Sequence, residues 1–308
     1  MTLTLALPVL ALALLVAHGR RRARALEREV GSRLPLGPEG VIVGAGEIRR
    51  EGSRAGGAVL LLHGFGDTPQ TLGYLADALH ARGWTVHAPL LPGHGRTLRD
   101  FAASRADEWE RAAYDAYDAL RARHERVAIV GLSMGGALAT LCARRDPAVP
   151  ALVLLAPYLG MPSRVRRLAL THALWSPFAP FVVSGSEASI HDESERVRSR
   201  AYGAVGGRML RELLHVVERA SDALPGLAVP TLVVHSRDDH RIAPADAERA
   251  YARIASPERR LVWLDGCGHL VTVDRQRERV FELTLEWLER HVRGERGARH
   301  SALGARRG

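Results

Sequence analysis

The sequence contains no lysine and only two cysteines among its 308 residues. Cys142 and Cys267 are too few for a disulfide framework, so we expect free thiols that belong to a reducing compartment or fill the core. Cys267 lies two residues before His269, but no second pair of ligands completes a zinc site. The sequence therefore predicts neither a disulfide nor a bound metal.

Because lysine is absent, all 43 basic residues are arginines, and against 34 acidic residues they give a net charge of +9. The excess lies largely in two tails, with four arginines within residues 19–24 and six within residues 290–308. No basic stripe studded with aromatic residues and no recognised nucleic-acid motif accompanies them. We therefore exclude nucleic acid as a partner, whereas contact with an anionic surface is favoured.

One long apolar run, Leu3 to Ala17, lies at the N-terminus. With about 15 residues, interrupted by Pro8, it is at the short limit for crossing a bilayer. The arginines follow the run and no cleavage site of small residues appears, so an uncleaved anchor fits better than a signal peptide. The positive-inside rule then places the following domain on the cytoplasmic face of the membrane. The alternative is a start codon assigned upstream of the true one, with a cytoplasmic protein.

Residues 1–18 are thus a possible membrane anchor, and the charged residues 19–38, which contain Gly and Pro, are predicted as a linker. From residue 39 to 292, short apolar runs alternate with amphipathic helical patterns. The predicted strands are 40–48, 58–62, 85–88, 127–132, 151–156, 231–235 and 260–264, and the predicted helices are 69–82, 107–123, 134–145, 244–254 and 275–292. This alternation predicts an α/β domain whose mostly parallel sheet is covered by helices on both faces.

The alternation stops between residues 157 and 228, an interval too long for a plain connection. Residues 165–183 and 208–223 carry helical patterns, and the first contains three aromatic residues, Trp175, Phe178 and Phe181. We interpret the interval as a helical cap inserted over the active site after the sixth strand. The basic residues 293–308, rich in Arg, Gly and Ala, are predicted as a disordered tail.

The most informative motif is Gly-Leu-Ser-Met-Gly at residues 131–135, between a β-branched run and a helical pattern. A sharp strand-to-helix turn holds a serine hydroxyl clear of its neighbours, at the positive end of a helix. Side chains at Gly131 and Gly135 would collide with the neighbouring strand and helix. The flanking elements favour a catalytic Ser133 over an ordinary turn that happens to contain serine.

The base that activates Ser133 must be chosen from 14 histidines. In sheets of this kind the acid and the base lie on loops after the last strands, in the chain order Ser, Asp, His. His269 fits this position, because two glycines let its loop approach the serine. His63 and His94 precede Ser133 in other loops, and His240 adjoins the expected acid, which could not easily orient it.

The acid is expected in the loop after the strand at 231–235, where either Asp238 or Asp239 could turn inward. We favour Asp239, since Ile242 lies three residues further on and can pin the loop. Asp238 can instead pair with Arg237 or remain in solvent.

Two backbone N–H groups are needed to bind the oxyanion that forms during attack. The Met134 N–H lies at the N-terminus of the predicted helix, where donors are unpaired. The second donor is expected in the loop His63-Gly64-Phe65-Gly66-Asp67, from the backbone of Phe65. The Phe65 ring could also line an acyl pocket.

With these residues in place, the chain resembles the α/β-hydrolase family, in particular bacterial monoacylglycerol lipases and small carboxylesterases. The resemblance covers about residues 58–291 and is most specific at residues 63–65, 131–136, 237–239 and 268–269. It implies the roles nucleophile for Ser133, acid for Asp239, base for His269 and oxyanion donor for the amides of Phe65 and Met134.

The resemblance also implies an activity: hydrolysis of monoacylglycerols or of short- to medium-chain acyl esters through an acyl-enzyme, without metal or organic cofactor. The expected partner is a small acyl ester, and no oligomeric state is predicted. The same triad serves thioesterases, amidases, carbon–carbon bond hydrolases and cofactor-free haloperoxidases. A catalytically inactive, membrane-associated binding module is the alternative from another class, and a complete set of Ser133, Asp239 and His269 argues against it.

Overall fold

A sheet of seven strands forms the centre of the domain in the computed structural model, which describes residues 3–53, 57–185 and 189–294. Its strands are β1 (Ile48–Arg50), β2 (Ala58–Leu62), β3 (Thr85–Ala88), β4 (Val127–Leu132), β5 (Leu152–Leu155), β8 (Thr231–Ser236) and β9 (Arg259–Leu264). They lie in the order β1-β3-β2-β4-β5-β8-β9. Only the edge pair β1–β3 is antiparallel among these neighbours, so the predicted mostly parallel sheet is confirmed.

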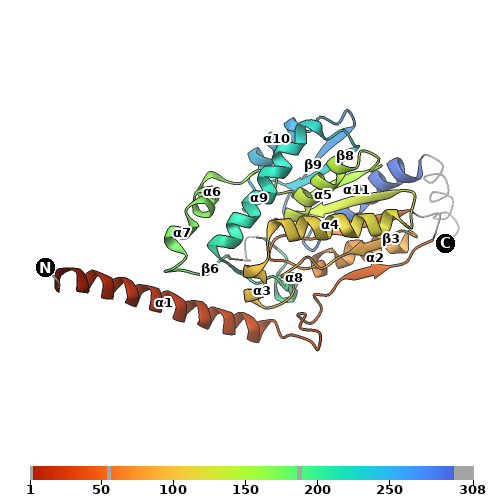
Figure 1. Cartoon of the computed structure of the whole chain (residues 1–308). Coiled ribbons are helices and arrows are strands. Elements are labelled where there is room, and N and C mark those ends of the chain that lie inside the picture. Colours follow the sequence, from red (N-terminus) through yellow and green to blue (C-terminus); the bar gives the residue numbers. More distant parts are fainter. Residues whose placement is uncertain (1–2, 54–56, 186–188, 295–308) are drawn as a thin grey trace.

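Helices cover both faces of the sheet, as predicted (Figure 1). One face carries α4 (Ala106–Arg121), α5 (Met134–Arg145), α9 (Gly207–Ala223) and α10 (Pro244–Arg253), and the other carries α2 (Gly73–Ala81) and α11 (Arg277–Leu288). Side chains alternate along β2, so that Leu60 packs under the first set and Leu61 under the second. Burial on both faces explains why β2, β4 and β5 are continuous apolar runs.

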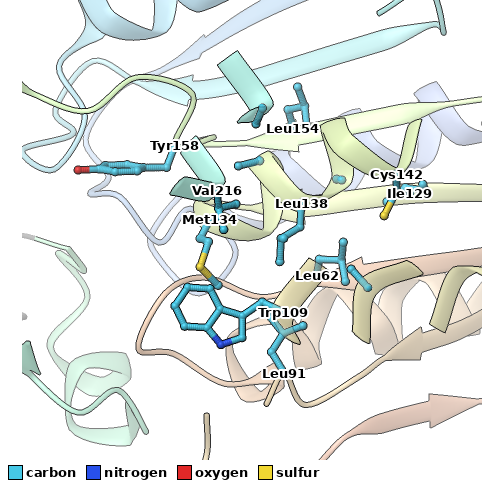
Figure 2. Close-up of a cluster of buried hydrophobic side chains, with 14 of the residues drawn as sticks. Leu62, Leu91, Trp109, Ile129, Met134, Leu138, Cys142, Leu154, Tyr158 and Val216 are labelled. Atoms are coloured by element: carbon cyan, nitrogen blue, oxygen red, sulfur yellow. The ribbon is translucent and has the colours of Figure 1, made fainter. Parts of the chain in front are cut away.

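The core on the α5 face anchors the start of α5 (Figure 2). The side chain of Met134 is fully buried there among Trp109 of α4, Leu138 of α5 and Val216 of α9. Cys142 lies in the same cluster and Cys267 in the cluster on the opposite face. Both are free, buried thiols, which confirms that they fill the core.

Four short helices connect these elements: η2 (Pro69–Leu72), α3 (Leu98–Ala103), η3 (Leu224–Gly226) and the π-helix η4 (Glu289–Arg293). The strand predicted at 40–48 is wrong, because only Ile48–Arg50 is extended and Leu36 and Ile42 form a single isolated bridge. Gly40 and Gly44 have φ angles of 67° and 81°, which interrupt an extended chain.

The segment 157–228 is inserted after β5, which is the fifth strand in chain order, so its predicted place after a sixth strand is wrong. It contains α6 (Ser163–Leu170), α7 (His172–Trp175), α8 (Glu193–Arg198), α9 and a two-stranded sheet of β6 (Val182–Val183) and β7 (Ala204–Val205). The helix predicted at 208–223 is confirmed by α9. The one predicted at 165–183 ends at Trp175, since Pro177 and Pro180 cannot continue it.

The N-terminal helix α1 (Leu3–Arg33) extends away from the domain at its N-terminal end (Figure 1). The residues predicted as a linker, 19–38, are helical up to Arg33, because Val30 and Leu34 become buried in the core of the α5 face. Among the described residues, no helix has the length and hydropathy needed to cross a membrane. The predicted tail lies outside the described residues from residue 295 onward.

Candidate active site

Ser133 lies at the tight turn between β4 and α5, as the glycine pattern predicted. Its backbone has φ 56° and ψ −118°, a conformation that L-residues rarely adopt. A Cβ on Gly131 would lie 2.2 Å from the carbonyl oxygen of Gly135, and a Cβ on Gly135 would lie 1.9 Å from that of Leu62. Glycine is therefore required at both positions.

The structure brings the three side chains predicted for the reaction into one hydrogen-bonded chain. Nε2 of His269 lies 2.8 Å from Oγ of Ser133, and its Nδ1 lies 2.7 Å from Oδ2 of Asp239. All three residues are buried, although they come from three loops at the carboxyl ends of β4, β8 and β9. The arrangement lets a proton pass from the hydroxyl to an oriented imidazole.

Asp239 is the inward carboxylate, as favoured over Asp238. Its Oδ1 accepts the backbone N–H groups of Arg241 and Ile242 at 2.7 and 3.0 Å. Burial opposes ionisation, but the positive charge and hydrogen bond of His269 outweigh it, so the pKa of Asp239 lies below its ordinary value. Asp238 instead accepts the N–H of Gly266 in an exposed turn.

Sequence reasoning missed His235, the second imidazole beside this acid. It is fully buried in β8, and its Nε2 lies 3.4 Å from Oδ2 of Asp239 and 3.1 Å from the carbonyl oxygen of Ile242. Burial lowers the pKa of His235, so the ring is neutral near pH 7. Its Nε2–H group donates to the carbonyl oxygen of Ile242. Every residue of β8 is buried, so the strand pattern predicts burial of His235 but does not reveal its partner.

The loop after β2 lies directly beside Ser133. A Cβ on Gly64 would be only 3.3 Å from Cβ of Ser133. Among the described residues, the N–H groups of Phe65 and Met134 do not donate to any backbone carbonyl. Both amides are therefore available to an oxyanion at this position.

His63 fixes the shape of that loop. Its Nε2 accepts the N–H of Leu91 at 3.1 Å, so Nδ1 carries the proton and donates to the carbonyl oxygen of Gly64 at 2.9 Å. Complete burial lowers the pKa of His63 to about 4. His63 and His94, whose ring centroids lie 5.1 Å apart, belong to the wall behind the loop and not to the proton path.

Asp67 ends the same loop, and burial shifts its pKa upward, opposite to the shift of His63. Its Oδ2 accepts the Thr71 hydroxyl at 2.7 Å, and its Oδ1 has no partner among the described residues. Burial raises the pKa of Asp67 to about 6. Between about pH 4 and 6, folding therefore binds a proton at Asp67 while it excludes one from His63.

We predict that His63→Gln, which keeps a donor and an acceptor without titrating, flattens the acid side of the stability profile. With a folded pKa of about 4 and an unfolded value of 6.5, neutral His63 stabilises the fold fully above pH 6.5. This contribution, on the order of 3 kcal/mol, is lost as the pH falls toward 4. Urea unfolding of both proteins at pH 7.5 and 4.5 checks it, and identical losses would contradict it.

The loop of His269 is also held by Asp274, another residue that sequence reasoning missed. This carboxylate is fully buried. Its Oδ2 accepts the N–H groups of Gly268 at 2.6 Å and His191 at 2.8 Å. Its Oδ1 accepts those of Asp192 at 2.9 Å and Arg275 at 2.8 Å. One side chain thus ties the inserted segment to the residue before His269.

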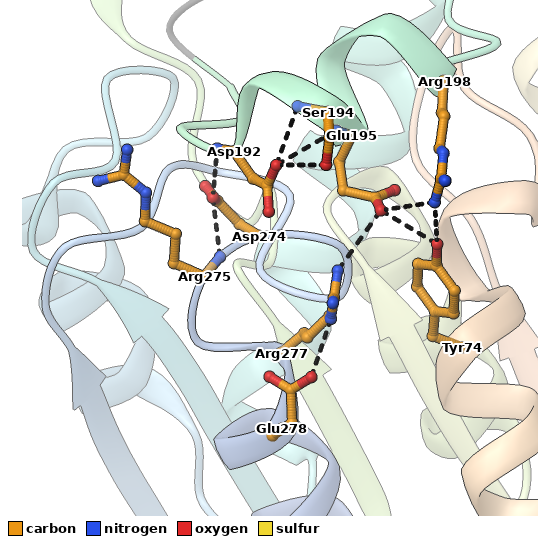
Figure 3. A network of polar contacts seen from close by, with 9 residues as sticks. All are labelled: Tyr74, Asp192, Ser194, Glu195, Arg198, Asp274, Arg275, Arg277 and Glu278. Carbon is orange, nitrogen blue, oxygen red and sulfur yellow. Dashed lines mark hydrogen bonds and ion pairs between the residues drawn. The ribbon is translucent and has the colours of Figure 1, made fainter.

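A second carboxylate strengthens this junction (Figure 3). Glu195 of α8 is buried, and its Oε1 accepts from the Tyr74 hydroxyl at 3.0 Å, from Arg198 at 3.2 Å and from Arg277 at 3.4 Å. The contacts join the inserted segment to α2 and to α11. The segment is therefore fixed to the domain on the His269 side of the cavity.

We predict that Asp274→Asn lowers both stability and turnover. The amide keeps one acceptor but turns a donor toward N–H groups, so the free energy of unfolding should fall by roughly 2–4 kcal/mol. Because Gly268 loses its support, we expect kcat to fall about 10-fold while KM changes little. Denaturant unfolding and steady-state kinetics measure both quantities.

Glu278→Gln is the matched control for this prediction, since it also replaces a carboxylate by an amide. Glu278 lies on the surface, where it pairs with Arg277. Exposed ion pairs contribute little, so its effect should stay within about 0.5 kcal/mol. Equal effects of the two substitutions would contradict the role of Asp274.

A cavity of about 400 Å³ opens onto Ser133 and His269. Much of its wall from the inserted segment is aliphatic and includes Val165, Leu168, Val182, Val205 and Leu210, but Tyr158, Ser184, Ser189 and Ser199 also line it. Trp175, Phe178 and Phe181, the aromatic residues of the predicted cap, do not line the cavity. Trp175 donates to the carbonyl oxygen of Leu168, Phe178 is 37% exposed, and Phe181 packs on the core.

The doubly covered parallel sheet, the strained serine turn and the Ser–His–Asp chain define an α/β-hydrolase with the geometry of a serine hydrolase. The family described as serine aminopeptidase, S33, matches residues 53–276. The chain belongs to this family.

Two related enzymes and a solved structure align with most of this chain. A thermostable monoacylglycerol lipase of Bacillus sp. (strain H-257) is 28% identical over 253 residues, which are 82% of this chain and 97% of the lipase. A carboxylesterase of Bacillus subtilis (strain 168) is 27% identical over 76% of this chain and 92% of the esterase. A solved structure reported for LipS and LipT, two metagenome-derived lipolytic enzymes, is 31% identical, with a TM-score of 0.74 over 82% of this chain and all of that one. The chain is a serine ester hydrolase.

Proposed function

We propose that the protein hydrolyses monoacylglycerols or short- to medium-chain acyl esters through an acyl-enzyme at Ser133. The observation that carries this proposal is the chain of hydrogen bonds from Ser133 through His269 to Asp239, which lies beside a largely apolar cavity. The volume of about 400 Å³ suits an acyl chain of moderate length. The names of the lipase and the esterase among the relatives support the same substrate class.

In the proposed reaction, Oγ of Ser133 attacks the ester carbonyl carbon while Nε2 of His269 takes the hydroxyl proton. Asp239 stabilises the resulting imidazolium, and the N–H groups of Phe65 and Met134 bind the oxyanion. The alcohol leaves with the proton from His269. Water then attacks the acyl-enzyme by the same route and releases the acid.

We predict that Ser133→Ala lowers the hydrolysis of p-nitrophenyl butyrate by a factor of about 10⁴ or more, because the nucleophile is gone. Labelling by a fluorophosphonate probe should also be lost, while circular dichroism shows an intact fold. Ser221→Ala, in which an exposed partner of Arg253 is removed from α9, is the control and should change neither readout. Cleavage of an aminoacyl p-nitroanilide or an acyl thioester faster than any ester would contradict the proposed substrate class.

We also infer that α1 attaches the protein to the cytoplasmic face of a membrane, lying in the interface and not across it. Val9, Leu10, Leu12, Leu14 and Leu15 are 49–64% exposed. The exposed arginines Arg20, Arg21, Arg22 and Arg24 follow them and can bind anionic headgroups. A Cβ on Gly19 would lie 2.0 Å from the carbonyl oxygen of Phe178, so α1 leaves the domain beside the inserted segment.

We predict that the full chain cosediments with phosphatidylcholine vesicles containing phosphatidylglycerol, and that Leu10→Gln/Leu14→Gln/Leu15→Gln weakens binding at least about 10-fold. Each buried leucine contributes on the order of 1.5 kcal/mol or more to such binding. Hydrolysis of the soluble ester p-nitrophenyl butyrate should not change. Val197→Gln, a substitution at a residue that is 80% exposed on α8, is the control. Undiminished cosedimentation of the triple variant would exclude α1 as the attachment.

A further inference from the structure

Arg241 is a cation in the wall of the catalytic cavity that the proposed mechanism does not use. It lies two residues after Asp239, and its backbone N–H donates to that carboxylate at 2.7 Å. Its side chain lines the same cavity as Ser133 and His269. A substrate in this cavity therefore meets a positive charge in the same wall that contains Ser133 and His269.

The guanidinium of Arg241 is held in place but only partly satisfied. Its Nε donates to Oγ of Ser189 at 2.8 Å, and one terminal nitrogen donates to the carbonyl oxygen of Gly185. A guanidinium has five N–H donors, so donors remain for a ligand. Among residues 3–53, 57–185 and 189–294, no carboxylate lies within ion-pair distance of it.

Burial makes this arrangement costly without a ligand. Removal from water lowers the pKa of Arg241, and the charge of Asp239 opposes this only in part. The Asp239 carboxylate is itself bound by His269 and by two backbone N–H groups. A partly buried cation beside an aliphatic wall is stabilised when an anion enters the cavity.

The surroundings of Arg241 indicate which part of the substrate carries that anion. Its anchor Ser189 accepts the N–H of Leu270 at 2.9 Å, so the guanidinium lies beside the His269 loop. The oxyanion donors Phe65 and Met134 come from other loops. Since His269 hands its proton to the leaving alcohol, groups on its side of the cavity face the alcohol portion of an ester.

We propose that Arg241 binds an anionic group, phosphate or carboxylate, on the alcohol portion of the substrate. The enzyme thus prefers acyl esters of anionic alcohols to those of neutral alcohols. Arg241 forms charge-assisted hydrogen bonds to the anion while the acyl chain occupies the aliphatic wall. This proposal rests on the ester hydrolysis proposed above and adds the charge of the substrate to it.

The test compares pairs of esters with one octanoyl chain. The pairs are 1-octanoylglycerol 3-phosphate against 1-octanoylglycerol, and O-octanoylglycolate against its amide, so phosphate and carboxylate are read separately. In the wild type, kcat/KM should be higher for at least one anionic ester than for its neutral partner. Arg241→Gln should lower that value about 10-fold to 100-fold and change the neutral esters less than about 3-fold. Arg241→Lys should restore part of the preference.

Arg237→Gln is the matched control, since it removes the same charge from the same loop. The Arg237 guanidinium lies 5.0 Å from the centre of the Trp263 ring and pairs with Asp265 outside the cavity. It should leave the preference unchanged.

Three results would overturn the proposal. The first is a wild type that prefers neither anionic ester, and the second is an equal loss of kcat/KM on neutral and anionic esters in Arg241→Gln. The third is a preference for ethyl hydrogen suberate over ethyl octanoate, which would place the anion on the acyl portion. Each of them can occur while Ser133 is labelled and neutral octanoylglycerol is hydrolysed. They are therefore distinct from a failure of the proposed esterase function, in which no ester is cleaved.

Discussion

The backbone of Ser133 has a positive φ of 56°, and a conformation of this kind costs on the order of 1–3 kcal/mol in a residue with a side chain. Contacts with the sheet hold it there. The Ser133 N–H donates to the carbonyl oxygen of Leu155 at 3.0 Å, and its own carbonyl oxygen accepts from Gly136 and Tyr158 at 2.9 and 3.0 Å. Because Leu155 belongs to the next strand, the parallel pairing of β4 and β5 fixes the position of the nucleophile, and the other groups are arranged around it.

The base is held from two sides by buried carboxylates whose charges are matched by backbone N–H groups. Asp239 orients the imidazole directly, whereas Asp274 holds the main chain at Gly268. A buried carboxylate is tolerated when such donors surround it, and Asp239 and Asp274 accept two and four of them. The charge of Arg241, by contrast, has no carboxylate partner among the described residues. It therefore differs from Asp239 and Asp274, whose charges are matched within the protein.

Much of the fold and the reacting residues could be predicted from local patterns. The glycines at 131 and 135 indicate the turn of Ser133, and the apolar runs of β2, β4 and β8 indicate the strands, because both reflect constraints within a few residues. Asp274 did not, because two of its donors lie at His191 and Asp192, far away along the chain. The helical course of residues 19–33 was missed because Val30 and Leu34 are stabilised by a core that only the folded chain forms. The positions of the cap's aromatic residues were missed for a similar reason, because the contacts of Trp175 with Leu168 and of Phe181 with the core form only in the folded chain.

The inserted segment both encloses the cavity and holds the base. Residues 189–192 lie against the His269 loop through the bond of Leu270 to Ser189 and through Asp274, so displacement there would release Gly268. The opposite wall includes Leu168 and Val182, which are 43% and 39% exposed. This part of the cavity wall is therefore in contact with solvent. Val182 lies four residues after Phe178, whose carbonyl oxygen meets α1 at Gly19, so an α1 that lies in the membrane interface would bring this part of the wall toward the lipid surface.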